Sequence, residues 1–284
     1  MTHEQAPISN APSPTPTIAL TIAGTDSGGG AGVAADLRTF AASGVFGTLV
    51  VTAVTAQNTV GLRQFLAMSP ELVAAQLDAV LEDMDVGAAK TGMLASRGVV
   101  ELLASRAARG VLPPLVVDPV LVSSSGKPIF GDDDITGAYC ELFASARVIT
   151  PNLPEAALLT GLQVTDLESM ETAARRLADL GPSLVIVKGG RRRDAEAVDV
   201  AFDGHSVTLL RAPWVETPNV HGTGCTFSAA IAANLALGLG PLEAAISAKK
   251  FVTRAIRGSS SWRLGAGHGP LDQTGAGSGA LRTA

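Results

Sequence analysis

The sequence predicts an α/β protein with a doubly wound, mostly parallel sheet and helices on both of its faces. Short apolar runs, typical of strands that are buried on both faces of a parallel sheet, alternate with segments that carry helix signals. Repetition of strand, helix and strand in this order favours right-handed crossovers around one sheet. The apolar runs expected to form strands are 17–23, 48–54, 115–118, 147–150 and 184–187.

Helix signals lie between these runs. Ser69 and Pro70 supply an N-cap and a proline suited to the first helical turn, which predicts a helix that reaches about residue 84. Thr165 and Glu168 have the spacing of a capping box, which predicts a second helix from this point.

The length and composition indicate one globular domain. The chain has 284 residues, of which 46% are hydrophobic and 17% are charged, and this excludes a mainly disordered chain. We expect a proline-rich leader at residues 1–16, a single domain over residues 17–264, and a flexible, glycine-rich tail at residues 265–284.

Composition also excludes several classes of partner. The net charge of -5 and the aromatic content of 4% provide neither the basic surface nor the stacking platforms of a nucleic-acid binder. No apolar stretch approaches the roughly 20 residues of a membrane span, and the start lacks the features of a signal peptide, so we expect a cytoplasmic protein without a membrane partner. Cys140 and Cys225 do not form a disulfide framework, and the four histidines lack metal-ligand spacing.

In this fold class, ligands bind in loops that follow the strands. The strongest candidate loop is 221–225, directly before a predicted helix over residues 226–237. Gly222 and Gly224 let successive backbone N–H groups point at one spot, and the helix dipole favours an anion there. Such a site would lower the pKa of the Cys225 thiol. The alternative is a tight helix cap with Cys225 as a small buried filler.

Three other loops carry polar residues with two interpretations each. Five glycines in the loop 24–32 indicate close approach of a ligand, although the loop matches neither a dinucleotide fingerprint nor a Walker A loop. Asp36 then either reaches a ligand or lies on a solvated face. Asp118 closes a buried strand, where it needs Mg²⁺, a salt bridge or a capping role. Asn152 and Glu155 either cap a helix or contact a ligand.

Together these loops resemble one known family. From about residue 19 to about residue 258, the chain carries eight motifs in a fixed order: 23–32 (AGTDSGGGAG), 35–37 (ADL), 56–59 (AQNT), 90–94 (KTGML), 117–120 (VDPV), 150–156 (TPNLPEA), 188–190 (KGG) and 221–226 (HGTGCT). In this order and spacing they resemble the ribokinase-like superfamily, and within it the hydroxymethylpyrimidine and phosphomethylpyrimidine kinases of thiamine synthesis. The sequence differs from the usual pattern at 122–125, where Val-Ser-Ser-Ser replaces a more typical Ala-Lys-Ser stretch.

The resemblance implies a ribokinase-like fold and an ATP-dependent, Mg²⁺-requiring homodimer. It would phosphorylate 4-amino-5-hydroxymethyl-2-methylpyrimidine and then its monophosphate. The residues that match the family's functional positions are Gln57, Asp36, Gly24, Met93 and Val120 for the pyrimidine, Lys188, Thr223 and Asn152 for the nucleotide, Asp118 and Glu155 for Mg²⁺, and Cys225, Gly222 and Gly224 for catalysis. Cys225 stands where most sugar kinases of the superfamily place an aspartate base. We interpret it as the proton acceptor, with positioning of the hydroxyl as the alternative.

Three other functions stay open at this stage. A pyridoxal kinase of the cysteine-containing type, serving vitamin B6 salvage, shares the loops, and pyridoxal is a similar flat hydroxymethyl heteroaromatic. Gln57 and Met93 favour the pyrimidine, because an amide offers both a donor and an acceptor to an aminopyrimidine. A salvage enzyme would perform only the first phosphorylation. A catalytically silent binding protein of the same fold is disfavoured, because the charged residues and the thiol of the motifs are intact.

Overall fold

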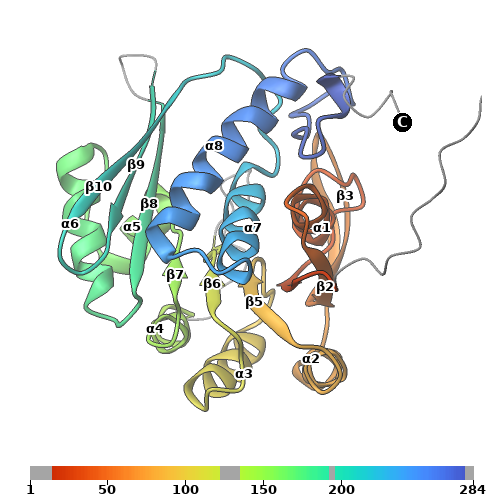
Figure 1. The fold of residues 1–284 in the computed structure, drawn as a ribbon, viewed down its shortest axis with the longest axis vertical. Helices are drawn as coiled ribbons and strands as arrows, with labels where there is room; N and C mark the ends of the chain where they lie inside the picture. Colours follow the sequence, from red (N-terminus) through yellow and green to blue (C-terminus); the bar gives the residue numbers. More distant parts are fainter. Residues whose placement is uncertain (1–14, 122–134, 192–195, 279–284) are drawn as a thin grey trace, which may run out of the picture.

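The computed structural model describes residues 15–121, 135–191 and 196–278. Within these residues, eight strands form one sheet in the order β10-β9-β8-β7-β6-β5-β1-β2, while β3 and β4 form a separate two-stranded ribbon (Figure 1). The strands are β1 Ile18–Ala23, β2 Phe46–Val51, β3 Ala53–Asn58, β4 Gly61–Ala67, β5 Val86–Thr91, β6 Leu115–Val117, β7 Val148–Ile149, β8 Leu184–Arg191, β9 Glu196–Phe202 and β10 Val207–Pro213. The predicted leader lies outside the described residues, apart from Thr15 and Pro16.

The predicted parallel sheet is confirmed. β2, β1, β5, β6, β7 and β8 run parallel, whereas β9 and β10 form an antiparallel hairpin at one edge. Leu20, Val116 and Ile186 are fully buried in this sheet. Their burial explains the continuous apolar runs, because helices cover both faces of the strands.

Helices form a layer on each face of the sheet. The helices are α1 Gly32–Ala42, α2 Pro70–Leu81, α3 Arg97–Ala108, α4 Thr136–Phe143, α5 Leu153–Thr160, α6 Leu167–Ala178, α7 Thr223–Ala236 and α8 Pro241–Ser259. α1, α7 and α8 pack on one face, and α2 to α6 pack on the other (Figure 1). α7 lies over β5 and β6 and is lined by small buried residues, so it approaches the sheet closely and brings its N-terminus to the ends of the central strands.

Two predicted elements differ in detail. The run 48–54 is not one strand, because the chain leaves the main sheet at Thr52 and continues into the separate ribbon. The Thr52 hydroxyl donates to the Met93 carbonyl at 2.5 Å, which holds this turn in place. The capping box of α6 is formed by Asp166 and Ser169 instead of Thr165 and Glu168, since the Asp166 carboxylate accepts from the Ser169 N–H at 2.9 Å.

The predicted tail boundary at residue 264 is wrong. Leu271 is only 2% exposed, and the Asp272 N–H donates to the Ala255 carbonyl at 3.1 Å. Gln273 joins two helices, because its amide donates to Thr226 and accepts from Arg38, both at 3.1 Å. Residues 265–278 therefore pack on the domain despite their glycine-rich composition, and 279–284 lie outside the described residues.

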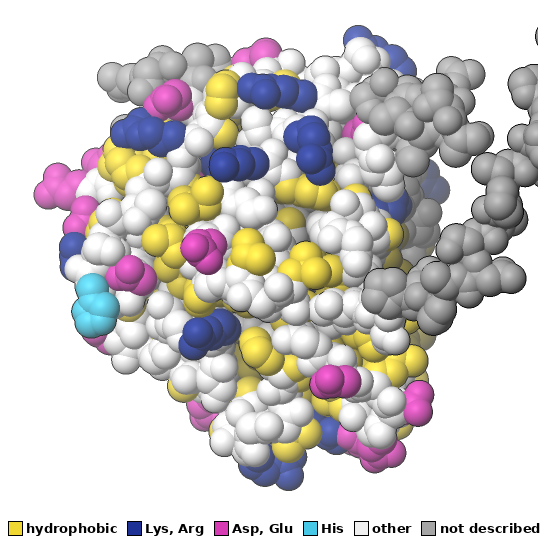
Figure 2. Space-filling model, in the orientation of Figure 1, with side chains coloured by type: hydrophobic (Ala, Val, Ile, Leu, Met, Phe, Trp, Pro, Cys, Tyr) yellow, Lys and Arg dark blue, Asp and Glu magenta, His cyan; other side chains and the backbone are white. Residues whose placement is uncertain are grey.

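Basic and acidic side chains are interspersed on the face that carries α8 (Figure 2). Lys250, Arg254 and Arg257 are exposed along this helix, while Ala244 and Ala248 are fully buried beneath it. α8 is thus an amphipathic surface helix. Among the described residues, none of the helices has the length and apolar character needed to cross a membrane.

Candidate active site

Two neighbouring cavities lie where the parallel strands end. The glycine-loop cavity, of about 220 Å³, is lined by the loop after β1 and by the start of α7. The Trp214 cavity, of about 420 Å³, lies between β8, the end of β10 and α8. Asn152, Lys188 and Gly224 line both cavities. A ligand that fills one cavity can therefore reach a ligand in the other at these three residues.

Most of the predicted site residues line the glycine-loop cavity. They are Gly24, Gln57, Met93, Asp118, Val120, Asn152, Glu155, Lys188, Gly222, Gly224 and Cys225. Thr223 lines the Trp214 cavity instead. Its hydroxyl donates to the Val220 carbonyl at 2.6 Å, so this side chain closes the turn before α7.

Asp36 is not a lining residue of either cavity, and its predicted contact with the pyrimidine is not supported. It is fully buried, where its Oδ2 accepts from the Lys90 ammonium at 2.9 Å and from the Thr21 hydroxyl at 2.6 Å. Asp36 on α1 is directed toward the sheet, where its carboxylate neutralises the buried Lys90 ammonium of β5. Asp36 therefore belongs to a buried ion pair that joins α1 to β5.

Asp26 and His221 were missed by the sequence analysis as site residues. The Asp26 carboxylate organises the glycine loop by accepting from the N–H groups of Gly28, Gly30 and Ala31, each at 2.9 Å. It also pairs with His221 Nε2 at 2.8 Å. Burial alone would raise the pKa of Asp26, but the His221 and backbone hydrogen bonds outweigh it and hold this pKa below its usual value.

His221 connects this loop to the predicted pyrimidine reader. The Gln57 amide nitrogen lies 3.3 Å from His221 Nε2, and both side chains line the glycine-loop cavity. Met93 forms part of the same wall, since a Cβ added at Gly24 would lie 2.5 Å from the Met93 methyl group. Thus a flat ring in this cavity would lie between an amide and an apolar surface.

Asp118 and Lys188 form a buried ion pair at the junction of the two cavities. Lys188 Nζ lies 2.7 Å from Asp118 Oδ1, which also accepts from the Thr150 hydroxyl at 3.0 Å. Burial would raise the pKa of Asp118, but the ammonium groups of Lys188 and Lys90 outweigh it and lower this pKa. The carboxylate therefore stays charged at neutral pH.

Glu155 lies in the same junction and has the opposite shift. It forms a capping box with Asn152, as the alternative interpretation of these residues expected, because its carboxylate accepts from the Asn152 N–H at 2.8 Å. Burial, and then the Asp118 charge, raise the pKa of Glu155 to about 7 despite the opposing effect of Lys188. The Lys188 ammonium thus acts on both carboxylates.

The carboxylates present fit Mg²⁺ only if phosphate oxygens and water molecules supply its other ligands. Mg²⁺ at phosphate-transfer sites is held by one or two carboxylates together with phosphate oxygens and water. Asp118 and Glu155 provide two such carboxylates on the cavity wall. Within the described residues there is no cluster of three or more His, Cys, Asp and Glu residues that would hold a metal without a ligand's help.

The start of α7 carries the predicted anion site. Gly222 is the N-cap residue with φ of 88°, in the left-handed region, and a Cβ there would collide with the Gly30 carbonyl oxygen. The helix begins at Thr223, whose N–H donates to the Val220 carbonyl at 3.2 Å, and Gly222, Gly224 and Cys225 line the glycine-loop cavity beside this helix end. This arrangement suits a phosphate group.

The pKa of Cys225 differs from its prediction. Desolvation by the surrounding protein raises the pKa of the thiol, and the nearby Lys90 ammonium only partly offsets this effect. The prediction of a lowered pKa at a helix N-terminus was therefore wrong, because burial disfavours the thiolate more than the Lys90 charge favours it.

Comparison with known proteins identifies the family of this arrangement. The profile of the family described as phosphomethylpyrimidine kinase matches residues 26–272. The chain belongs to this family. A hydroxymethylpyrimidine/phosphomethylpyrimidine kinase of Synechococcus elongatus is 48% identical over 255 residues, which cover 89% of this chain and 96% of the relative.

Solved structures show the same fold. The Bacillus subtilis pyridoxal kinase in its ADP complex has a TM-score of 0.83 and 36% identity, covering 95% of this chain and all of its own. The Staphylococcus aureus pyridoxal kinase in complex with AMP-PCP and pyridoxal has a TM-score of 0.82 and 34% identity, covering 92% of this chain and 95% of its own. The predicted ribokinase-like fold is confirmed.

Membership of the phosphomethylpyrimidine kinase family confirms that this chain is an enzyme and a kinase. The similarity to curated relatives also favours phosphorylation of the hydroxymethylpyrimidine of thiamine synthesis over the pyridoxal kinase and silent-binding alternatives.

Proposed function

We propose that this kinase transfers the γ-phosphoryl group of ATP to 4-amino-5-hydroxymethyl-2-methylpyrimidine and then to the resulting monophosphate. The observation that carries this proposal is the meeting of two cavities at Asn152, Lys188 and Gly224. The glycine-loop cavity suits the small pyrimidine, and the larger Trp214 cavity suits the nucleotide. The γ-phosphate would then lie at the junction, beside the start of α7.

In the glycine-loop cavity, Gln57 would read the pyrimidine edge and Met93 would pack against the ring. Val120 lines the same cavity and adds apolar surface. Gly24 permits this close packing, since any side chain there would displace Met93. His221 Nε2 donates to the Asp26 carboxylate, which places the imidazole ring beside the amide of Gln57.

At the junction, Lys188 and the first turn of α7 would bind the transferring phosphoryl group. Gly222 and Gly224 keep the backbone close to the group, and the helix N-terminus supplies positive potential where negative charge develops. Asp118 and Glu155 would hold Mg²⁺ with the phosphates, and the ion would supply charge neutralisation. Thr223 and Asn152 would complete the phosphate end of the nucleotide site.

The two phosphorylations differ in their proton balance. In the first, the hydroxyl oxygen bonds to the γ-phosphorus, the bond to the β–γ bridging oxygen breaks, ADP leaves, and the hydroxyl proton must be accepted. Cys225 lines the cavity. Because its pKa is raised, only its minor thiolate form would accept that proton, and the protonated thiol would position the hydroxyl instead. In the second, the attacking atom is a phosphate oxygen that has already lost its proton near pH 8, since the second pKa of such an ester is about 6.

A product assay tests this function. The purified protein is incubated with ATP and Mg²⁺ and, in separate reactions, with the hydroxymethylpyrimidine, its monophosphate and pyridoxal, and the products are identified by mass spectrometry. The diphosphate formed from the monophosphate is the expected product. Turnover of pyridoxal alone would overturn the substrate assignment, and turnover of the hydroxymethylpyrimidine alone would restrict the enzyme to the first step.

We further propose a cytoplasmic homodimer. The β3–β4 ribbon carries exposed apolar side chains, among them Leu66 at 68% and Val54 at 50% exposure. Phe46 and Leu49 on the adjacent edge strand β2 are also exposed. A second copy would cover this apolar surface. Light scattering after size-exclusion chromatography should give twice the chain mass, and Leu66→Glu should shift the protein to the monomer mass.

A further inference from the structure

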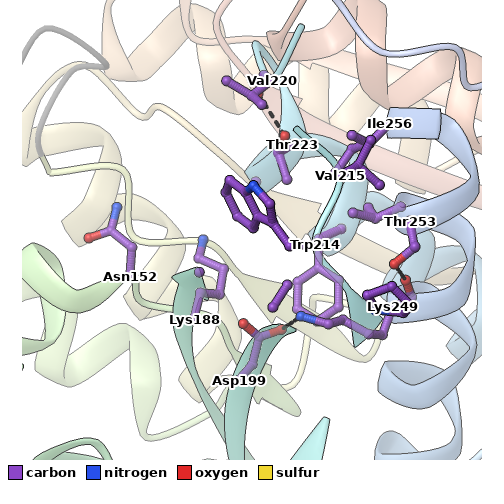
Figure 3. Close-up of a pocket in the computed structure, with 16 residues that line it drawn as sticks. Asn152, Lys188, Asp199, Trp214, Val215, Val220, Thr223, Lys249, Thr253 and Ile256 are labelled. Carbon is purple, nitrogen blue, oxygen red and sulfur yellow. Dashed lines mark hydrogen bonds and ion pairs between the residues drawn. The ribbon is translucent and has the colours of Figure 1, made fainter. Parts of the chain in front are cut away.

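The Trp214 cavity has an aromatic wall that the sequence analysis did not detect. Trp214 follows directly after β10, and its half-buried side chain lines the cavity. Figure 3 shows the indole ring directed into the space between Lys188 on β8 and the residues of α8. Trp214 lines this cavity and not the glycine-loop cavity.

The indole is held in a fixed orientation. Its Nε1–H donates to the Glu216 carboxylate at 3.0 Å, and Glu216 is exposed two residues further along the chain. A ring that is oriented before binding loses little conformational entropy when a ligand stacks on it. Trp214 therefore has the properties of a preformed stacking platform.

The polar side chains of the cavity wall are paired with one another. Lys249 Nζ lies 2.6 Å from Asp199 Oδ2, and Asp199 Oδ1 accepts from the Gly189 N–H at 3.1 Å. The Thr253 hydroxyl donates to the Lys249 carbonyl at 2.8 Å (Figure 3). These bonds hold the Lys249, Asp199 and Thr253 side chains against the wall of the cavity.

The other side chains that line the cavity are mainly apolar, and the charge of Lys188 lies at one end of it. Apolar surface comes from Val215, Val220, Phe227, Val252 and Ile256. Lys188 supplies positive charge only at the end that opens into the glycine-loop cavity. The cavity therefore suits a ligand with a flat apolar body and an anionic end.

We propose that Trp214 stacks on the base of the nucleotide donor and that this cavity reads the base by its face and not by its hydrogen-bonding edge. This inference rests on the proposed use of ATP at this site. It follows that ADP and GDP bind with similar affinity, because their bases have similar stacking areas. CDP and UDP bind more weakly, because a single ring covers less of the indole.

Fluorescence titration tests the proposal directly. Trp262→Phe leaves Trp214 as the sole tryptophan of the chain, since the sequence contains two. In this background, ADP and GDP should change the emission of Trp214 and give dissociation constants within about threefold of each other, while CDP binds at least about fivefold more weakly. Equal binding of ADP and CDP, or a selectivity for ADP over GDP above about tenfold, would contradict reading by the face of the base.

Substitutions separate stacking from the phosphate contacts. Trp214→Ala should weaken ADP binding about tenfold or more, measured by calorimetry, whereas Trp214→Phe should retain most of the affinity. Both variants should bind inorganic tripolyphosphate, which has no base, as the unmodified protein does. Intact tripolyphosphate binding also shows that Trp214→Ala is folded.

Different outcomes separate the stacking role of Trp214 from the kinase function. If ADP binds and Trp214→Ala leaves its affinity unchanged, the stacking role is wrong and the proposed kinase function stands. If the unmodified protein binds neither ADP nor ATP, the proposed function itself is wrong. Equal weakening of ADP and tripolyphosphate binding by Trp214→Ala would mean that Trp214 shapes the site without contacting the base.

Discussion

Cys225 shows how a local motif gives the position of a residue without its chemistry. The motif at 221–226 correctly places the thiol beside a helix N-terminus, where a lowered pKa is expected. In the structure, desolvation and the carboxylates of Asp36 and Asp118 raise its pKa, and the Lys90 ammonium only partly offsets them. The sequence contains no signal for desolvation at a single atom, because desolvation depends on the packing of segments that are distant in the chain.

The raised pKa predicts a slow thiol. Because less thiolate exists at any pH below the pKa, alkylation of Cys225 by iodoacetamide at pH 7 should be slower than that of a free cysteine, whose pKa is about 8.5. The rate should still be rising with pH above pH 9. Peptide mass spectrometry over a pH series measures it, with a cysteine-containing peptide as the reference. A rate above that of the peptide at pH 7 would restore the prediction of a reactive thiol.

The proton balance of the two reactions predicts that Cys225 matters in only one of them. Cys225→Ala should lower kcat for the hydroxymethylpyrimidine about 100-fold or more, the usual effect of removing a general base. The same variant should lower kcat for the monophosphate by less than about tenfold, since that nucleophile carries no proton. Steady-state kinetics with each substrate compares the two, and each reaction controls for misfolding in the other. Near-normal turnover of the alcohol would remove the proton-accepting role.

His221 is predicted to act on the pyrimidine through Gln57. Removing its ring in His221→Ala also leaves Asp26 without its strongest side-chain partner, which should lower the free energy of unfolding by about 2 kcal/mol. The KM for the pyrimidine should rise about tenfold, and more than the KM for ATP. His205→Ala is the matched control, because His205 is exposed in the β9–β10 hairpin. A rise in the KM for ATP alone would place His221 in the nucleotide site.

At the scale of elements, the contact between α7 and the glycine loop can be tested by substituting the two glycines that flank this helix. Gly222 precedes the helix with φ of 88° and Gly238 follows it with φ of 92°. Alanine at either position should cost about 1–2 kcal/mol of stability for the backbone conformation. A Cβ at Gly238 meets nothing within 4 Å, whereas at Gly222 it collides with the glycine loop.

Gly222→Ala should therefore weaken ATP binding and lower kcat strongly, while Gly238→Ala should lose stability alone. Chemical denaturation and steady-state kinetics on both variants measure the two effects. Equal kinetic losses in the two variants would show that α7 responds to backbone strain in general and that contact with the glycine loop is unimportant.

The elements were predictable to the extent that their signals are local. The strand runs at 17–23 and 115–118 were found because continuous apolar residues report burial on both faces. β5 was missed, because Lys90 interrupts its apolar pattern, and only the buried ion pair with Asp36 makes that lysine compatible with a strand core. The break at Thr52 depends on its contact with Met93, 41 residues away, and has no local signal.

At the scale of the whole molecule, the sequence placed the site at the strand ends but divided the chain at the wrong point. Parallel strands bring the loops after β1, β6, β7 and β8 to one edge of the sheet. The parallel topology alone therefore predicts that the motifs in these loops lie close together. Motifs supply only one end of the Trp214 cavity, through Lys188 and Thr223, because much of the rest of its wall comes from β9, β10 and α8, which carry no motif. The end of the domain was misjudged for a similar reason, because the glycine-rich composition at 265–278 gives no indication of the few specific contacts that this segment makes.

Those contacts predict that residues 265–278 stabilise the domain. Truncation after residue 264 removes the buried Leu271 and both hydrogen bonds of Gln273 to α1 and α7. Burial of one leucine contributes roughly 2 kcal/mol and each hydrogen bond about 1 kcal/mol, so the free energy of unfolding should fall by about 3 kcal/mol or more. Truncation after Ser278 is the matched control, because it retains every described contact of this segment. Urea denaturation of the two proteins compares them. Identical midpoints would mean that residues 265–278 contribute nothing to the domain, as a flexible tail would, and that the helices α1 and α7 hold the glycine-loop cavity together without them.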